Sequence, residues 1–157
     1  DLTPHYVVEE DAKYFHGVLK NVCDNHHSGY YEAFKKWADD YFFIKHRNET
    51  RGIGGIFFDR LAANEEFTKE QRWEFVKTVG ESFAPIYSHL MKKNAVIPFT
   101  EKEKEWQKIR RGRYVEFNLV YDKGTKFGLD TNGRTESILM SLPPHAAWEY
   151  HHEVIPG

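Results

Sequence analysis

The stretch RRGRYVEFNLVYDKGTKFGLDTNGRTESILMSLPP, residues 110–144, decides the predicted fold. Apolar and polar side chains alternate from 114 to 122, and this period of two predicts a β-strand with one apolar face. Turn-forming residues follow at 122–125 and at Asn132-Gly133, and further strands are expected over 126–131 and 134–142. The stretch therefore predicts an antiparallel meander that ends at Pro143-Pro144.

The turns and one face of this meander carry many charged side chains: Arg111, Arg113, Asp122, Lys126, Arg134 and Glu136. They can be read as solvated strand edges, since charges there oppose aggregation. They can also be read as the wall of a cleft that binds a polyanionic organic ligand, with carboxylates placed for proton transfer. The sequence leaves both interpretations open.

The remainder of the chain shows helical signals in groups. Apolar side chains recur at helical spacing after Glu9 and again from Phe34 to Tyr41. Thr68 with Gln71, and Thr100 with Glu103, have the spacing of capping boxes, and Pro85 is expected to kink or divide the helix that contains it. A short strand is expected over 42–45 and another over 52–61. Grouped helices and strands favour the α+β class.

The composition sets broad limits. A chain of 157 residues that is 40% hydrophobic predicts one domain with a sizeable core. A net charge of -2 gives no reason to expect nucleic acid as a partner. The single cysteine, Cys23, excludes an internal disulfide and fits a reducing compartment. No apolar run is long enough to predict a transmembrane segment.

Long parts of the chain resemble the oxygen-dependent coproporphyrinogen III oxidase family. The resemblance covers residues 110–144, DLTPHYVVEEDAKYFH at 1–16, KKWADDYFFIKHRNETRGIGGIFFDRL at 35–61, and WEY at 148–150. It implies that residues 1–157 are the C-terminal half of a single domain, with the N-terminal half and the extreme C-terminus absent. The implied fold is a large, rather flat antiparallel β-sheet flanked by helices on both faces.

The resemblance also implies an activity. Members convert two propionates of coproporphyrinogen III to vinyl groups, giving protoporphyrinogen IX in heme biosynthesis, with O2 as co-substrate and no organic cofactor. The fragment alone is expected to be inactive, because the proposed catalytic histidine of the family lies outside it. The alternative is a non-catalytic protein that binds tetrapyrroles or other polycarboxylates. The family implies a homodimer whose interface includes Tyr114 to Gly133. A cytoplasmic location is expected, with the mitochondrial intermembrane space as the alternative.

The resemblance assigns roles to individual residues. Asp122 and Asp1 match acidic positions at the family's cleft, where a carboxylate can accept pyrrole N–H groups and act as a base. Asp122 also suits an ordinary turn cap. The propionates are expected to contact basic and turn residues, which are Arg47, Arg51, Arg111, Lys126, Asn132, Gly133 and Arg134. Each arginine could instead form surface pairs.

Two histidines, His16 and His46, match positions of divalent-metal ligands in bacterial members, and manganese is the implied ion. Two histidines thirty residues apart form no metal-binding spacing motif. Hydrogen-bonded structural histidines are the competing interpretation.

Overall fold

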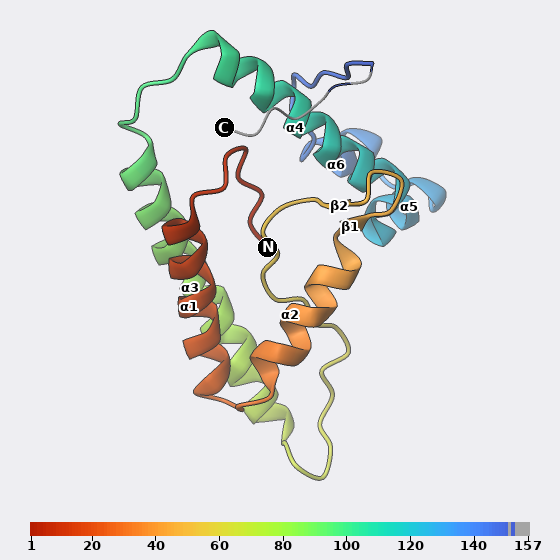
Figure 1. Cartoon of the computed structure of the whole chain (residues 1–157). Coiled ribbons are helices and arrows are strands. Elements are labelled where there is room, and N and C mark those ends of the chain that lie inside the picture. Colours follow the sequence, from red (N-terminus) through yellow and green to blue (C-terminus); the bar gives the residue numbers. More distant parts are fainter. Residues whose placement is uncertain (151, 153–157) are drawn as a thin grey trace. The chain divides into compact units, whose positions relative to one another are not determined.

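The computed structural model describes residues 1–150 and 152. Within these residues the chain forms six helices and one two-stranded sheet, and it divides into two compact units. Unit 1 comprises Asp1–Phe43 and Gly52–Pro98, and unit 2 comprises Ile44–Arg51 and Phe99–Gly157. Figure 1 labels the elements along the chain.

Unit 1 is built on three helices, α1 (Glu9–Asp24), α2 (Tyr30–Tyr41) and α3 (Lys69–Asn94). α1 lies beside α3 and also contacts α2 (Figure 1). Their apolar stripes meet in two clusters of buried side chains, the first formed by Phe15, Leu19, Ile86 and Leu90, and the second by Cys23, Tyr30, Phe34 and Phe75. The helical spacing read from the sequence is therefore confirmed as the source of this core.

The predicted helix starts are also confirmed. Thr68 accepts the Gln71 backbone N–H at 3.2 Å while the Gln71 side chain accepts the Thr68 N–H at 2.7 Å. Thr100 and Glu103 form the same reciprocal pair at the start of α4 (Glu101–Val120). Each pair satisfies donors that a helix N-terminus leaves without partners. α3 continues through Pro85, so the helix is not divided there.

The glycines near position 54 let two backbone segments approach closely in unit 1. Leu2 N–H donates to the Gly54 carbonyl at 3.0 Å, and Ile53 N–H donates to the Leu2 carbonyl at 3.0 Å. A Cβ on Gly52 would lie 2.3 Å from the Leu2 oxygen, and this distance is too short for any residue with a side chain. Gly54 has a φ of +78°, in the region that favours glycine. The strand predicted over 52–61 is wrong, because these residues form no regular element.

Unit 2 contains little β-structure. β1 (Phe43–Ile44) pairs with β2 (Glu49–Thr50), which confirms the short strand predicted over 42–45. α4, α5 (Lys123–Asp130) and α6 (Thr135–Leu139) follow in the C-terminal part. None of the helices among the described residues combines the length and apolar character needed to cross a bilayer.

The predicted α+β fold with a large, flat antiparallel sheet is wrong. The whole expected meander, residues 114–142, forms the end of α4 followed by α5 and α6. Two buried positions of α4, Gly112 and Phe117, lie three and eight residues after the buried Ile109, which is helical spacing. A helix already started by the Thr100 capping box gains one hydrogen bond for each added residue, so it continues through the alternating segment.

Residues 122–125 form the start of a helix, where the sequence predicted a turn between strands. Asp122 accepts the Thr125 backbone N–H at 2.7 Å, so it caps the N-terminus of α5 instead of ending a strand. Aspartate is favoured at helix N-caps as well as in turns, and the sequence alone does not separate the two.

Candidate functional site

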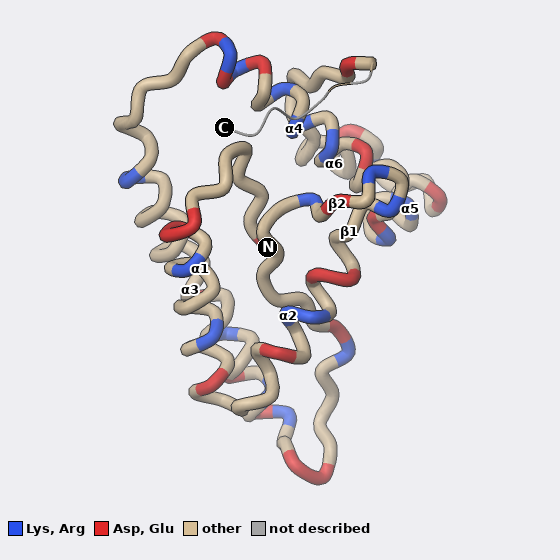
Figure 2. The backbone as a smooth tube through the Cα atoms, in the orientation of Figure 1, with Lys and Arg blue, Asp and Glu red and all other residues tan. Residues whose placement is uncertain are grey.

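The candidate site in unit 2 is a group of arginines held by two glutamates on the β1–β2 hairpin and α4. The arginine cluster is defined by four guanidinium groups and two carboxylates, Arg47, Arg51, Arg110, Arg113, Glu49 and Glu116. Arg47 donates two hydrogen bonds to Glu116, at 2.9 Å from Nε and 2.6 Å from Nη2. On the other side, Glu49 pairs with Arg110 at 2.9 Å and Arg113 at 3.1 Å. Figure 2 colours the Lys and Arg positions blue and the Asp and Glu positions red along the backbone, and both kinds occur on the β1–β2 hairpin and on α4.

Glu116 is the carboxylate at the centre of the cluster. Its side chain is only 12% exposed, and it also accepts hydrogen bonds from His46 Nε2 at 2.7 Å and Trp148 Nε1 at 2.9 Å. Burial raises the pKa of this carboxyl, but the hydrogen bonds from Arg47, His46 and Trp148 outweigh it and lower the pKa to about 2. Glu116 is therefore ionised near neutral pH and acts as a fixed acceptor.

Gly112 explains how Trp148 reaches this carboxylate. The Ala147 N–H donates to the Lys108 carbonyl of α4 at 3.0 Å. A Cβ on Gly112 would lie 2.6 Å from the Ala147 oxygen. Only glycine allows residues 147–148 to lie this close to α4, and that approach carries the indole N–H to Glu116.

Arg51 is the most buried arginine of the cluster, at 7% exposure. Its guanidinium lies over the Tyr114 and Phe117 rings of α4, 5.1 Å and 4.7 Å from their centroids. Cation–π contacts of this kind favour a desolvated guanidinium. The cluster gathers four guanidinium groups in one region, and guanidinium groups are suited to binding a carboxylate ligand.

The two candidate metal ligands are both engaged in hydrogen bonds. His16 Nε2 lies 2.8 Å from the Ile53 carbonyl, to which it donates, and its Nδ1 lies 3.0 Å from the Tyr31 hydroxyl. His46 Nε2 donates to Glu116, and its Nδ1 lies 2.8 Å from the Tyr121 hydroxyl. His16 belongs to unit 1 and His46 to unit 2.

These surroundings do not fit a metal site. A histidine ligand needs one ring nitrogen free for the metal, and here both nitrogens of each ring have protein partners. Among the described residues, no group of three or more His, Cys, Asp or Glu side chains could hold an ion. No step of the proposed chemistry is therefore assigned to a metal.

Asp122 lies directly after α4, half-buried, where it caps α5. Both the backbone N–H and the hydroxyl of Thr125 donate to the same oxygen, Oδ2, at 2.7 Å and 2.8 Å. Asp122 therefore acts locally as the N-cap of α5.

The remaining predicted substrate contacts lie on or after α4. Arg111 is half-buried one position from Arg110, while Lys126 and Arg134 are exposed. The N–H groups of Asn132 and Gly133, expected to bind a carboxylate, donate instead to carbonyls of α5 at 3.3 Å and 2.9 Å. The backbone of this turn therefore closes the end of α5.

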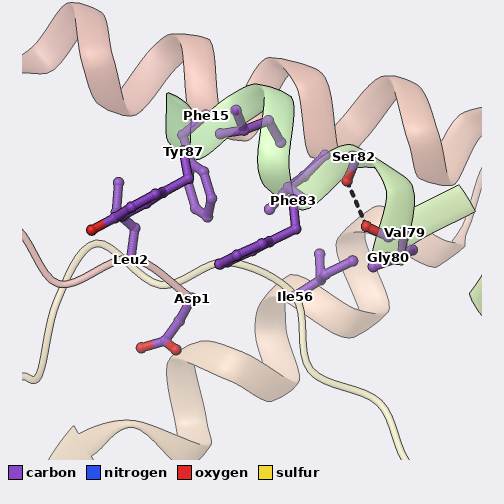
Figure 3. Close-up of a pocket in the computed structure, with 11 residues that line it drawn as sticks. Asp1, Leu2, Phe15, Ile56, Val79, Gly80, Ser82, Phe83 and Tyr87 are labelled. Atoms are coloured by element: carbon purple, nitrogen blue, oxygen red, sulfur yellow. Dashed lines mark hydrogen bonds between the residues drawn. The ribbon is translucent and has the colours of Figure 1, made fainter. Parts of the chain in front are cut away.

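Asp1 lines a separate pocket in unit 1, with a volume of about 290 Å³. Its walls are mainly apolar and come from α1, α3 and Ile56. Phe83 and Tyr87 stack with their ring planes 4° apart, and Figure 3 shows them side by side on α3. The Asp1 carboxylate points away from these rings (Figure 3).

Sequence reasoning named Arg113 among the charged residues of a possible cleft, but it missed Glu49 and Arg110 of the arginine cluster. It also missed two neighbours of the cluster, Tyr121, which contacts His46, and Trp148, which donates to Glu116. A helical reading of 110–121 would have found some of them. Residues three or four apart on a helix share a face, so Arg110, Arg113 and Glu116 would then point toward one partner.

Comparisons with known proteins assign the chain to a family. The family model described as coproporphyrinogen III oxidase matches residues 1–157. A chloroplastic oxygen-dependent coproporphyrinogen-III oxidase of Hordeum vulgare is 54% identical over 100% of this chain and 39% of its own length. The Drosophila melanogaster enzyme is 56% identical over 98% of this chain and 39% of its own length. The mitochondrial enzyme of Rattus norvegicus is 58% identical over 97% of this chain and 34% of its own length. The chain therefore belongs to the coproporphyrinogen III oxidase family.

Two expectations need correction. The chain spans between 34% and 39% of these relatives, so it is less than half of such a protein, and the comparisons do not support its placement as the C-terminal half. The expected cytoplasmic location is contradicted, because the barley relative is named chloroplastic and the rat relative mitochondrial. A single near-neutral, cysteine-poor chain carries no compartment signal that could have revealed this.

Proposed function

We propose that this chain forms part of an oxidoreductase that carries out the oxygen-dependent oxidative decarboxylation of coproporphyrinogen III. Two propionates of the substrate become vinyl groups, O2 is the oxidant, and CO2 and peroxide are the other products. Membership of the family supports the reaction class. The structural observation that supports the proposal is the arginine cluster, because guanidinium groups are suited to a substrate whose periphery is four carboxylates.

The cluster's part in this reaction is substrate positioning. A guanidinium holds a carboxylate through two parallel hydrogen bonds, which fixes orientation as well as distance. Glu116 and Glu49 fix the arginines beforehand, so less side-chain freedom is lost when substrate binds. We assign Arg47 and Arg51 to propionate binding, with Arg111, Lys126 and Arg134 as further contacts along the same C-terminal segment.

Proton removal from a pyrrole N–H is assigned to Asp122, with Asp1 as a second acidic contact. An electron-rich pyrrole that loses its proton reacts more readily with O2, so the protein's task is to bind, orient and deprotonate. General-base catalysis contributes on the order of 10²–10⁴ in rate. No organic cofactor is assigned a role in this scheme.

We further propose that the protein is a homodimer whose interface includes Tyr114 to Gly133. The support is a group of apolar side chains at the end of α4 and on α5 that unit 2 leaves exposed: Leu119, Val120, Phe127 and Leu129, with exposures from 38% to 70%. A second copy would cover them. Since these residues are helical, the interface would be formed by helix faces and not by strand edges. Phe127→Asp should shift the sedimentation profile of the full-length protein from dimer to monomer.

The activity is tested on the full-length protein with coproporphyrinogen III in air and under argon. Protoporphyrinogen IX should form only in air, with CO2 released. Substrate that stays unchanged in air would contradict the proposal. Tight binding without turnover would instead support the second candidate, a non-catalytic tetrapyrrole-binding protein.

A further inference from the structure

A second pocket of unit 1 contains two arginines that the function proposed above does not use. Its volume is about 490 Å³, and it is formed by the start of α2, the loop over 60–67 and the first turns of α3. The lining groups relevant here are the cations Arg60 and Arg72, the aromatic rings Tyr30, Phe34 and Phe67, and the polar side chains His27, Asn64 and Glu66. Its size is within the range of small-molecule sites.

Arg72 is a half-buried cation without an acidic partner. Its guanidinium lies 4.1 Å from the Phe67 ring centroid and 5.5 Å from that of Tyr30, and Nη1 donates to the Tyr30 hydroxyl. Its Nε is buried without a hydrogen-bond partner. In the described part of the chain no carboxylate lies within ion-pair distance of Arg72. Removing a guanidinium from water without a counter-charge is unfavourable, so the site favours an anion.

Arg60 adds a second cation to the same pocket. It is exposed, with a φ of +50°, and it too has no acidic partner among the described residues. Its carbonyl accepts the Ala62 N–H at 2.8 Å, which holds the loop in a tight bend at this point. Two cations of this pocket therefore lack the acidic partners that surround the arginines of unit 2.

The one carboxylate of the pocket is directed elsewhere. Glu66 Oε1 lies 3.4 Å from His27 Nε2. The Gly29 N–H donates to His27 Nδ1 at 3.1 Å, so Nε2 carries the proton that points to Glu66. Glu66 thus neutralises neither arginine, and the pocket has a net charge of about +1 with a neutral imidazole, from one carboxylate against two guanidiniums.

We propose that this pocket binds a small organic monocarboxylate with an aromatic or alkyl body. The carboxylate pairs with Arg60 and Arg72. The body lies on the aromatic rings and on the apolar side chains of Ala33, Leu61, Ala62 and Ala63. The apolar lining and the single excess charge favour a monoanion of this kind over inorganic phosphate, which has no apolar part and usually engages more donors. The inference is independent of the proposed oxidase activity, since it concerns binding to other residues.

The test uses 3-phenylpropionate as the probe and 3-phenylpropionamide as its uncharged control. Binding is followed by 15N–1H spectra of the full chain, through the amide signals of Gly29, Ala62 and Ala63. The acid should shift these signals saturably, and the amide should not. Arg60→Gln should weaken binding at least about tenfold, as expected for a lost charge-assisted hydrogen bond.

Two controls keep the test decisive. Arg47→Gln, in the arginine cluster, should leave the shifts at Gly29, Ala62 and Ala63 unchanged. Arg72→Lys keeps the charge and tests the planar fork, and its fold is checked by thermal melting. Equal binding of acid and amide, or an unchanged affinity in Arg60→Gln, would overturn the proposal. Since no turnover is measured, failure here leaves the oxidase proposal untouched, and an inactive oxidase leaves this site untouched.

Discussion

The arginine cluster of unit 2 and the Asp1 pocket of unit 1 are built on opposite principles. The cluster consists of ion pairs and charge-assisted hydrogen bonds, most of them around Glu116. The Asp1 pocket is mainly apolar, with the exposed Phe83 and Tyr87 rings on one wall. The proposed substrate combines both characters, because acidic side chains surround an apolar ring system. The difference shows that charged and apolar contact surfaces lie in separate units of this chain, and we propose that each recognises one part of the substrate.

Asp122→Asn should produce the largest change. Asparagine is as good an N-cap as aspartate, so α5 should be retained and stability should change by no more than about 0.5 kcal/mol. The amide cannot accept a proton, so kcat of the full-length enzyme should fall at least about 100-fold. Steady-state kinetics and a thermal melt check both parts. A normal kcat would show that Asp122 is not the base. Unit 2 would then contribute to substrate binding only.

Glu116→Gln should destabilise the fold more than any other single change in the cluster. Arg47, His46 and Trp148 lose an ionised acceptor, and half-buried guanidinium groups lose their counter-charge. The free energy of unfolding should fall by about 2–3 kcal/mol, measured by urea denaturation. Glu9→Gln is the matched control, since Glu9 forms an ion pair with Lys13 in which the two side chains are 80% and 74% exposed. That change should cost no more than about 0.5 kcal/mol.

The stability difference between the wild type and Glu116→Gln should depend on pH. The folded pKa of Glu116 is lowered from 4.5 to about 2, so its contribution to stability is complete above the unfolded value. The difference in unfolding free energy between wild type and Glu116→Gln should be constant above about pH 5 and should shrink as the pH falls toward about 2. Urea titrations at several pH values measure it. A difference that grows on acidification would show that Glu116 is not held ionised by the arginines.

Phe83→Ala should give the smallest effect and probes the apolar side of the comparison. Phe83 is 68% exposed, so its removal should change stability by less than about 0.5 kcal/mol. If its ring contacts the substrate, KM of the full-length enzyme should rise about fivefold with kcat retained. Trp73→Ala, on the same helix outside the pocket and 57% exposed, is the control. Equal KM values for the two variants would separate the pocket from substrate binding.

The sequence predicted unit 1 far better than unit 2. The stripes of α1 and α2 and the capping box of Thr68 and Gln71 are local signals with one structural meaning, and the structure contains all of them. In unit 2 only the capping box of Thr100 and Glu103 was as clear. The segment 109–122 carries two periods at once, an alternation of apolar residues from 114 onward and the helical spacing of Ile109, Gly112 and Phe117. Only the tertiary contacts decide between them, because Glu116 must lie on the same helix face as Arg113 to meet Arg47.

The arginine cluster was predicted only in part, because some of its members depend on the helical conformation of 110–120. Arg47 and Arg51 were identified from the resemblance, and the structure brings them to α4. Arg113 was named among the charged residues of a possible cleft, but Arg110 and Trp148 were missed, since their role depends on α4 continuing as a helix where a strand was predicted. The partners of His16 and His46 lie 15 to 75 residues away along the chain, and no spacing motif announces such hydrogen bonds.

The account depends most on the claim that the arginine cluster binds the carboxylates of the tetrapyrrole. The direct measurement is the dissociation constant of coproporphyrin III, the oxidised analogue, for the wild type, Arg47→Gln and Lys102→Gln, by fluorescence titration of the full-length protein. Arg47→Gln should bind about tenfold more weakly, while Lys102→Gln, an exposed charge on α4 outside the cluster, should match the wild type. Equal affinity for all three proteins would contradict the account.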